Sequence, residues 1–143
     1  MIQKPLTIDQ MKDHGLSSIY LMLMGYALES ILKGIYMSLK PESNVRDLPG
    51  KSHELNEIVD KINDTNSNSH LIRLDKTQKF LLDRLSEHSR WIGKYPVPTT
   101  VNDILPRDYP GGGYGPMRTF SSSDPEDCRV LYNQFEEILN LRM

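Results

Sequence analysis

The stretch from Leu16 to Lys40 constrains the fold most, because it is the only segment that is apolar around most of a helix. Projected at about 100° per residue, seven residues share one narrow stripe, and nearly all of the remaining circumference is Leu, Ile, Met, Ala and Tyr; the stripe consists of Ser18, Met22, Gly25, Glu29, Lys33, Tyr36 and Lys40. Such a helix is covered by neighbours on several sides, so we expect the rest of the chain to pack around it. Glu29 and Lys33 stand one helical turn apart on the stripe, and we interpret them as a solvated ion pair.

Length and composition indicate a soluble globular protein. The 143 residues are enough for one domain with a real core, so we expect residues 1–143 to form a single helical domain. The hydrophobic content is 38% and the charged content 25%. The single cysteine, Cys128, excludes a disulfide framework and a multi-cysteine zinc site, which is typical of the cytoplasm. We expect neither a metal nor a cofactor.

The apolar and charged segments of the chain narrow the classes of possible partner, such as membranes and nucleic acids. The apolar run from Ile19 to Ala27 is too short to span a bilayer and no small-residue cleavage site follows it, so we expect no membrane anchor and no signal peptide. The net charge of −2 argues against indiscriminate binding to nucleic acid. Bases nevertheless outnumber acids from Leu71 to Lys94, and acids outnumber bases from Asp124 to Met143. Mutual attraction, a local anion surface and ordinary solvated helix faces all explain this asymmetry, and we favour the last.

Helix signals divide the first half of the chain. Thr7 and Gln10 have capping-box spacing, which predicts a helix that runs to Pro41, with Gly15 as a point where it kinks or restarts. Residues 41–50 contain two prolines and a glycine and indicate a loop. Ser52 is expected to cap a second helix, whose apolar residues recur at helical spacing: Leu55, Ile58, Val59 and Ile62.

The second half contains two further helices. Asp75 is a plausible cap for a third helix that ends near Gly93, and Ser123 precedes a last helix with a proline and acids in its first turn. Residues 94–123 between them are irregular and rich in proline and glycine. No segment shows sustained strand alternation. The sequence therefore predicts an all-α fold, an up-and-down bundle of four or five helices with a long loop before the last one.

No motif names an enzyme directly. The chain has no Walker loop, GxGxxG, HExxH, GxSxG or CxxC motif. The glycine run from Gly111 to Gly115 follows no predicted strand and opens no helix, so we interpret it as a loop. The four histidines lie in separate segments without ligand spacing, which argues against a metal site.

The most informative polar residues are Arg84 and His88, which fall within the apolar arc of the third helix. A charged group and a histidine at such positions need partners. Three explanations remain open: satisfaction by a neighbouring backbone or side chain, a helix-helix seam between two copies of the chain, and a reactive cleft.

Three sequence segments together resemble the HEPN superfamily of small bacterial helical domains. They are GYALESILKGI at residues 25–35, GKSHELNEI at residues 50–58 and RLSEHSRWIGKYPVP at residues 84–98. The resemblance implies a helical bundle that dimerises and acts in toxin-antitoxin, stress or phage-defence systems. Active members are metal-independent ribonucleases, whose hallmark is an arginine followed by a histidine after four to six residues.

The arginine-histidine pairs of this chain define its candidate catalytic residues. Only three residues separate Arg84 from His88, whereas Arg46 and His53 have the family spacing but precede the second helix. If the chain cleaves RNA, His88 is the acid or base and Arg84 or Arg90 stabilises the phosphate. Arg46 and His53 are the alternative pair.

Two functional interpretations follow. The first, which we favour because the hallmark is altered, is a HEPN-like binding module without catalysis. The resemblance implies that it is a homodimer, and it would serve as a protein partner or as an RNA- or nucleotide-associated component of a bacterial regulatory or defence system. The second is a metal-independent endoribonuclease toxin of the same fold. Trp91 and Tyr95 are candidate interface residues, and a third possibility is that the long loop docks a protein partner through Tyr95, Tyr109 and Tyr114.

Overall fold

The computed structural model describes residues 8–42, 54–65, 71–92, 107–108, 110, 114–115 and 121–142, with side chains omitted at 8–18, 91–92 and the two strands. These residues form an all-α structure, as the sequence predicts. Four α-helices and one π-helical turn carry it: α1 (Ile8–Leu39), α2 (Leu55–Thr65), α3 (Lys76–Glu87), η2 (His88–Ile92) and α4 (Asp124–Arg142). The strands β1 (Arg107–Asp108) and β2 (Tyr114–Gly115) pair antiparallel within the stretch predicted to be a loop.

Helix α1 has the predicted extent. It begins at Ile8, directly after the proposed cap Thr7, and ends at Leu39, just before Pro41. The helix continues through Gly15 without interruption, so the weak point does not divide it. Thr7 itself lies outside the described residues. None of the helices that are described is long and apolar enough to cross a membrane.

Helix α2 buries the four predicted apolar residues, Leu55, Ile58, Val59 and Ile62. It begins at Leu55 rather than directly after Ser52, which lies outside the described residues. The Leu55 backbone N–H donates to the Ser86 Oγ of α3 at 3.0 Å. The first turn of α2 is therefore capped by a side chain from another helix, a contact that local sequence cannot reveal.

The caps of the last two helices agree with the sequence. Asp75 caps α3 through a reciprocal capping box, in which Asp75 Oδ1 accepts from the Gln78 backbone N–H at 2.7 Å and Gln78 Oε1 accepts from the Asp75 N–H at 3.1 Å. The Ser123 carbonyl accepts from the Asp127 N–H at 3.0 Å, which places Ser123 at the cap of α4. One difference is that α3 continues as the π-helical turn η2 instead of as a regular helix.

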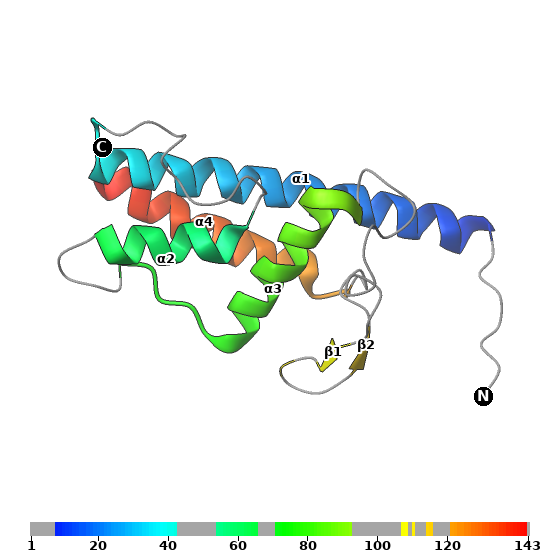
Figure 1. The fold of residues 1–143 in the computed structure, drawn as a ribbon. Helices are drawn as coiled ribbons and strands as arrows, with labels where there is room; N and C mark the ends of the chain where they lie inside the picture. Colours follow the sequence, from blue (N-terminus) through cyan, green and yellow to red (C-terminus); the bar gives the residue numbers. More distant parts are fainter. Residues whose placement is uncertain are drawn as a thin grey trace.

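Helix α1 is central, as its apolar circumference predicts, and α2, α3, η2 and α4 all pack against it. Figure 1 shows α1, α2 and α4 running in the same direction, with α3 crossing them. Two contacts between α1 and α4 support this direction. The charge of Asp124, at the start of α4, helps to raise the pKa of Tyr20 in the first half of α1, and Gly34, near the end of α1, lies against Leu139 near the end of α4. The expected up-and-down order is therefore wrong, because the successive helices α1 and α2 run in the same direction as each other and as α4. Long connections do not force successive helices to be antiparallel, as short ones do.

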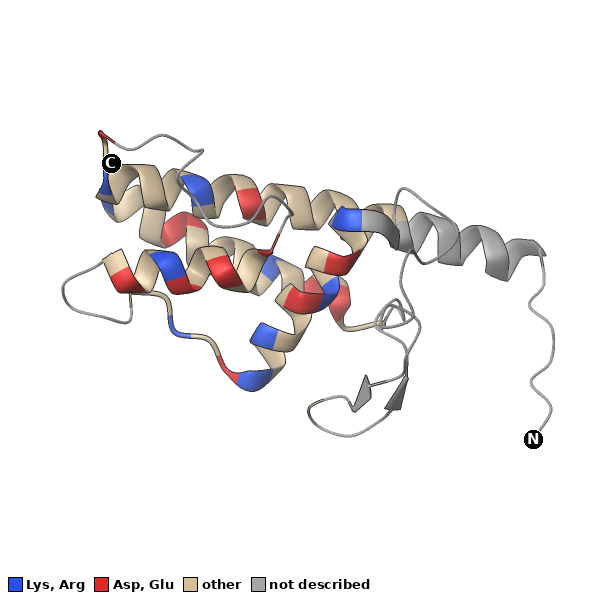
Figure 2. Cartoon of the chain, in the orientation of Figure 1, with Lys and Arg blue, Asp and Glu red and all other residues tan. Residues whose placement is uncertain are grey.

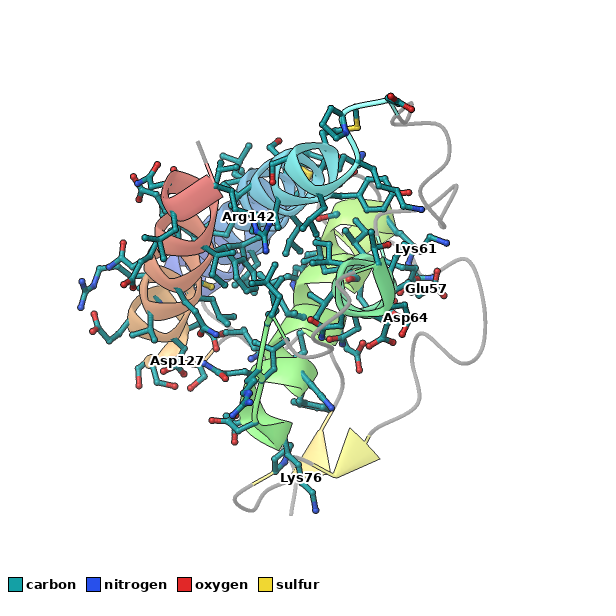
Figure 3. All side chains as sticks on the ribbon, turned by 90° about the vertical axis from the view of Figure 1, so that its left-hand side faces the viewer. Glu57, Lys61, Asp64, Lys76, Asp127 and Arg142 are labelled. Carbon is teal, nitrogen blue, oxygen red and sulfur yellow. The ribbon has the colours of Figure 1, made fainter. Side chains whose placement is uncertain are left out.

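The core lies between α1 and the other helices. Its largest fully buried side chains include Leu28 and Leu32 from α1, Leu82 from α3 and Phe135 from α4. The charged residues of α2 lie away from this core, and Figure 3 shows Glu57, Lys61 and Asp64 together on the outer side of that helix. Figure 2 shows that the described part of α1 carries few charges compared with the other helices.

Candidate functional site

The middle of the polar stripe of α1 lies on the inside of the molecule. Gly25 and Glu29 are buried there, whereas Ile19 and Leu23 are 44% and 56% exposed on the outer face. Lys33 forms an ion pair with the carboxylate of Glu29, and the Glu29 residue is only 7% exposed. The expectation of a solvated pair is therefore wrong for Glu29, because this carboxylate is buried, although the Lys33 side chain is 34% exposed.

Among the described residues, seven buried polar residues make up the candidate site. Its members are buried side chains from α1, α3, η2 and α4: Glu29, Arg84, Ser86, Glu87, His88, Ser89 and Asp124. Buried charges and hydroxyl groups are costly unless each has a hydrogen-bond or ionic partner. The contacts of each member therefore indicate whether these residues stabilise the fold or are available for catalysis or binding.

Arg84 is paired with Asp124 at the start of α4. Arg84 Nη1 lies 2.8 Å from Asp124 Oδ1, and Nη2 lies 2.7 Å from Oδ2, which is a bidentate arrangement. The two residues are 4% and 2% exposed. Asp124 Oδ2 also accepts from the Ser121 backbone N–H at 2.8 Å. Both terminal nitrogens of the guanidinium are thus engaged by a carboxylate inside the same chain.

His88 is completely buried and contacts the backbone one turn earlier. Its Nδ1 lies 2.8 Å from the carbonyl oxygen of Arg84. A carbonyl oxygen only accepts, so Nδ1 carries the proton in this contact, and in the neutral ring Nε2 is the acceptor. Of the three explanations for the polar residues of α3, satisfaction by neighbouring groups agrees with these contacts. The seam between two chains disagrees with the structure, since both residues are buried in the interior of one chain.

Among the candidate catalytic residues that the structure describes, Arg90 is the most exposed, and it is held between two carboxylates. Its Nη1 lies 2.8 Å from Glu54 Oε1, and Nη2 forms an ion pair with Glu87. Burial raises the pKa of the Glu54 carboxyl, the charge of Arg90 opposes that rise, and the nearby Glu57, Glu87 and Asp83 add to it. The surroundings of Arg90 are therefore strongly acidic.

Helix α1 and η2 approach each other closely at Gly25. A Cβ placed on Gly25 would lie 2.1 Å from Ser89 Oγ and 3.0 Å from the Leu85 carbonyl oxygen. The hydroxyl of Tyr26 donates to the Ser89 carbonyl at 3.3 Å. Only glycine fits at position 25 beside Ser89 and Leu85. Gly25 therefore has a packing role that helical periodicity does not reveal.

The buried thiol of Cys128 lies near the Arg84–Asp124 pair. Burial raises its pKa to about 12, with a further contribution from the charge of Asp124. Tyr20 behaves similarly, because burial and the neighbouring Cys128 and Asp124 raise the pKa of its hydroxyl. Both groups keep their protons at neutral pH, so neither supplies a nucleophile there.

The side chains of the remaining predicted site residues lie outside the described part of the structure. Arg46, His53, Tyr95 and Tyr109 lie outside the described residues, and Trp91 and Tyr114 are described by their backbones alone. Within the described ranges, no three side chains of His, Cys, Asp or Glu are grouped so that they could hold a metal ion.

The asymmetry of charge along the chain has a counterpart in the structure. The Arg84–Asp124 pair joins the basic segment to the acidic one, and Gln134 of α4 donates to the Arg73 carbonyl at 3.1 Å. Arg73, Lys76 and Lys79 are exposed, as expected of solvated helix faces. The sequence did not identify Asp124 as the partner of Arg84, although the opposite charges of their two segments indicate such a pairing.

Comparisons of the chain with protein-family models, with characterised proteins and with solved structures found no match.

Proposed function

We propose that this chain is a non-catalytic, HEPN-like binding module that works as a homodimer in the cytoplasm. The observation that supports the lack of catalysis is the bidentate Arg84–Asp124 pair. An arginine that stabilises a phosphate during RNA cleavage needs free donors directed at the substrate. Here both terminal nitrogens of Arg84 are bound to a buried carboxylate, and His88 is enclosed beside it.

The outer face of α1 supports the homodimer. The ten residues from Ile19 to Leu28 contain no charged side chain, yet Ile19 and Leu23 are exposed. A helix that is apolar all round is normally covered on every side. A second copy of the chain would cover this face, and the module would act with a protein partner, an RNA or a nucleotide in a bacterial regulatory or defence system of the toxin-antitoxin kind.

The test of catalysis is incubation of the purified protein with mixed RNA in excess EDTA, with fragment sizes read over time. We expect the RNA to remain intact with the wild-type protein, because Arg84 and His88 are occupied in the interior. His53→Ala and His88→Ala are run beside it, and circular dichroism checks that each variant is folded.

Metal-independent cleavage by the wild-type protein would overturn the proposal. Its loss in His53→Ala alone would place a ribonuclease site at Arg46 and His53. Its loss in a folded His88→Ala alone would place the site at Arg84 and His88 and would support the ribonuclease toxin instead.

The test of the homodimer is the molar mass in solution of the wild type and of Leu23→Glu. We expect a dimer for the wild type and a monomer with unchanged helix content for Leu23→Glu, because a carboxylate at the centre of an apolar interface is not compensated. Val130→Glu is the matched control, since Val130 is also exposed and apolar but lies on α4. A monomeric wild type, or equal dissociation in both variants, would contradict the proposed interface.

A further inference from the structure

The start of α3 and the connection before it carry three exposed cations at every third residue: Arg73, Lys76 and Lys79. Within the described ranges none of the three forms an ion pair, whereas Arg84 and Arg90 are each bound to a carboxylate. Figure 2 shows basic segments gathered where α3 begins and on the connection that leads into it. These three positive charges are therefore available to a ligand.

The carboxylates nearest to these cations along the chain are engaged elsewhere. Asp75 Oδ1 accepts from the Gln78 backbone N–H at 2.7 Å as the cap of α3, and Asp83 Oδ1 accepts from Asn56 Nδ2 of α2 at 2.7 Å. Both carboxylates serve hydrogen bonds inside the chain rather than neutralising the cations. The start of α3 thus has an excess of positive charge, although the whole chain has a net charge of −2.

The backbone that carries the cations is fixed by the neighbouring helices. The side-chain amide of Asn63 in α2 binds both backbone groups of Ile72, donating to its carbonyl at 3.0 Å and accepting from its N–H at 2.9 Å. Gln134 of α4 donates to the Arg73 carbonyl at 3.1 Å and accepts from Gln78 Nε2 at 3.5 Å. Because this segment is already ordered, a ligand loses less binding energy in ordering it.

An aromatic side chain lies beside the cations. Phe80 stands one helical turn after Lys76, on the same side of α3, and is half-buried. Proteins bind single-stranded nucleic acid by combining cations that contact the phosphates with aromatic rings on which the bases stack. An acidic peptide would require only the cations, so the aromatic neighbour favours a nucleic acid.

We propose that this basic surface, formed by Arg73, Lys76, Lys79 and Phe80, binds single-stranded RNA, with the cations on its phosphates and the ring against a base. Single-stranded RNA fits better than duplex DNA because its loops leave base faces open, whereas the bases of a duplex are stacked inside it. The inference rests on the proposed function in one point, namely that RNA is among the partners of the module.

The test is the affinity of the full chain for a labelled single-stranded RNA of mixed sequence, read by fluorescence anisotropy in EDTA between about 50 and 200 mM salt. Lys76→Gln combined with Lys79→Gln removes two cations and keeps good helix formers. We expect weaker binding and a slope of log affinity against log salt that is less steep by about 1.4, at about 0.7 for each lost contact to a single strand.

The matched control is Lys40→Gln combined with Arg142→Gln. It removes the same charge from exposed positions near the ends of α1 and α4. We expect this variant to keep the salt slope of the wild type, because neither cation belongs to the basic surface.

Phe80→Leu separates the contribution of the ring from that of the charges. We expect binding to weaken about fivefold or more, as for the loss of one stacked base, while the salt slope stays unchanged. Phe80→Tyr keeps an aromatic ring and should bind as the wild type does. Circular dichroism checks that each variant is folded.

Three results would each overturn the RNA-binding surface: no binding by the wild type at the lowest salt, equal slope changes in the two double variants, or wild-type affinity in a folded Phe80→Leu. Polyglutamate that competes as well as RNA of the same charge would also overturn it and would indicate an acidic protein partner. RNA recovered intact after a failed titration leaves the non-catalytic module unaffected, whereas RNA fragments would overturn the proposed function itself.

Discussion

Replacing Asp124 with alanine is expected to lower the free energy of unfolding by about 3–5 kcal/mol, which is typical when one partner of a buried ion pair is removed. The substitution leaves the buried Arg84 guanidinium without its bidentate carboxylate and removes the acceptor of the Ser121 N–H. Urea unfolding followed by circular dichroism measures the effect. It is the largest that we expect from any single substitution in the described residues.

Asp127→Ala is the matched control for Asp124→Ala, because Asp127 lies one turn further along α4 and less deeply buried. We expect it to change the unfolding free energy by only about 0.5 kcal/mol or less, as is usual for substitutions away from buried features. The double variant Arg84→Met with Asp124→Leu should recover most of the lost stability, since apolar side chains often replace a buried pair without net cost. A loss of less than about 1 kcal/mol in Asp124→Ala would show that the pair does not form.

Gly25→Ala is expected to lower the free energy of unfolding by about 1–3 kcal/mol, as overpacking usually does. The added Cβ would lie 2.1 Å from Ser89 Oγ and 3.0 Å from the Leu85 carbonyl, so the Ser89 hydroxyl would have to move and α1 would have to shift slightly away from α3. Thermal and urea unfolding both report the change. On helix propensity alone the same substitution would be stabilising, which makes the sign of the effect diagnostic.

Gly34→Ala provides the matched control on the same helix. A Cβ at Gly34 would meet Leu139 Cδ2 at 3.5 Å, which is an ordinary packing distance. We therefore expect this variant to be unchanged or stabilised by up to about 1 kcal/mol. Ser89→Ala combined with Gly25→Ala should recover part of the loss, because it removes the nearest clashing atom. Equal effects of the two glycine substitutions would contradict the close approach of α1 and η2.

The helices could be predicted from the sequence because their signals are local. The capping box of Asp75 and Gln78, the four apolar residues of α2 and the stop before Pro41 each depend on residues within a few positions of one another. Periodicity also predicted that Arg84 and His88 lie on the apolar side of the third predicted helix, which corresponds to α3 and η2. Their burial in the structure agrees with that prediction.

The candidate site could be predicted only in part. The sequence identified Arg84, His88 and Arg90 as unusual but did not identify Asp124 as the partner of Arg84 or Glu54 as a partner of Arg90. The sequence predicts that Glu29 and Lys33 lie in solvent because charged residues usually do, whereas the structure buries the Glu29 carboxylate. A helical projection shows which residues share a face but not whether that face meets water or another helix.

The sequence by itself therefore determined which segments are helical, where most of them begin and end, and that α1 is central. Only the tertiary structure decided that α1 and α4 run in the same direction, that Ser86 caps α2 and that Arg84 pairs with Asp124. The physical reason is the range of the interactions. Propensity, caps and periodicity act between neighbours in the chain, whereas helix direction and ion pairing depend on groups that only folding brings together.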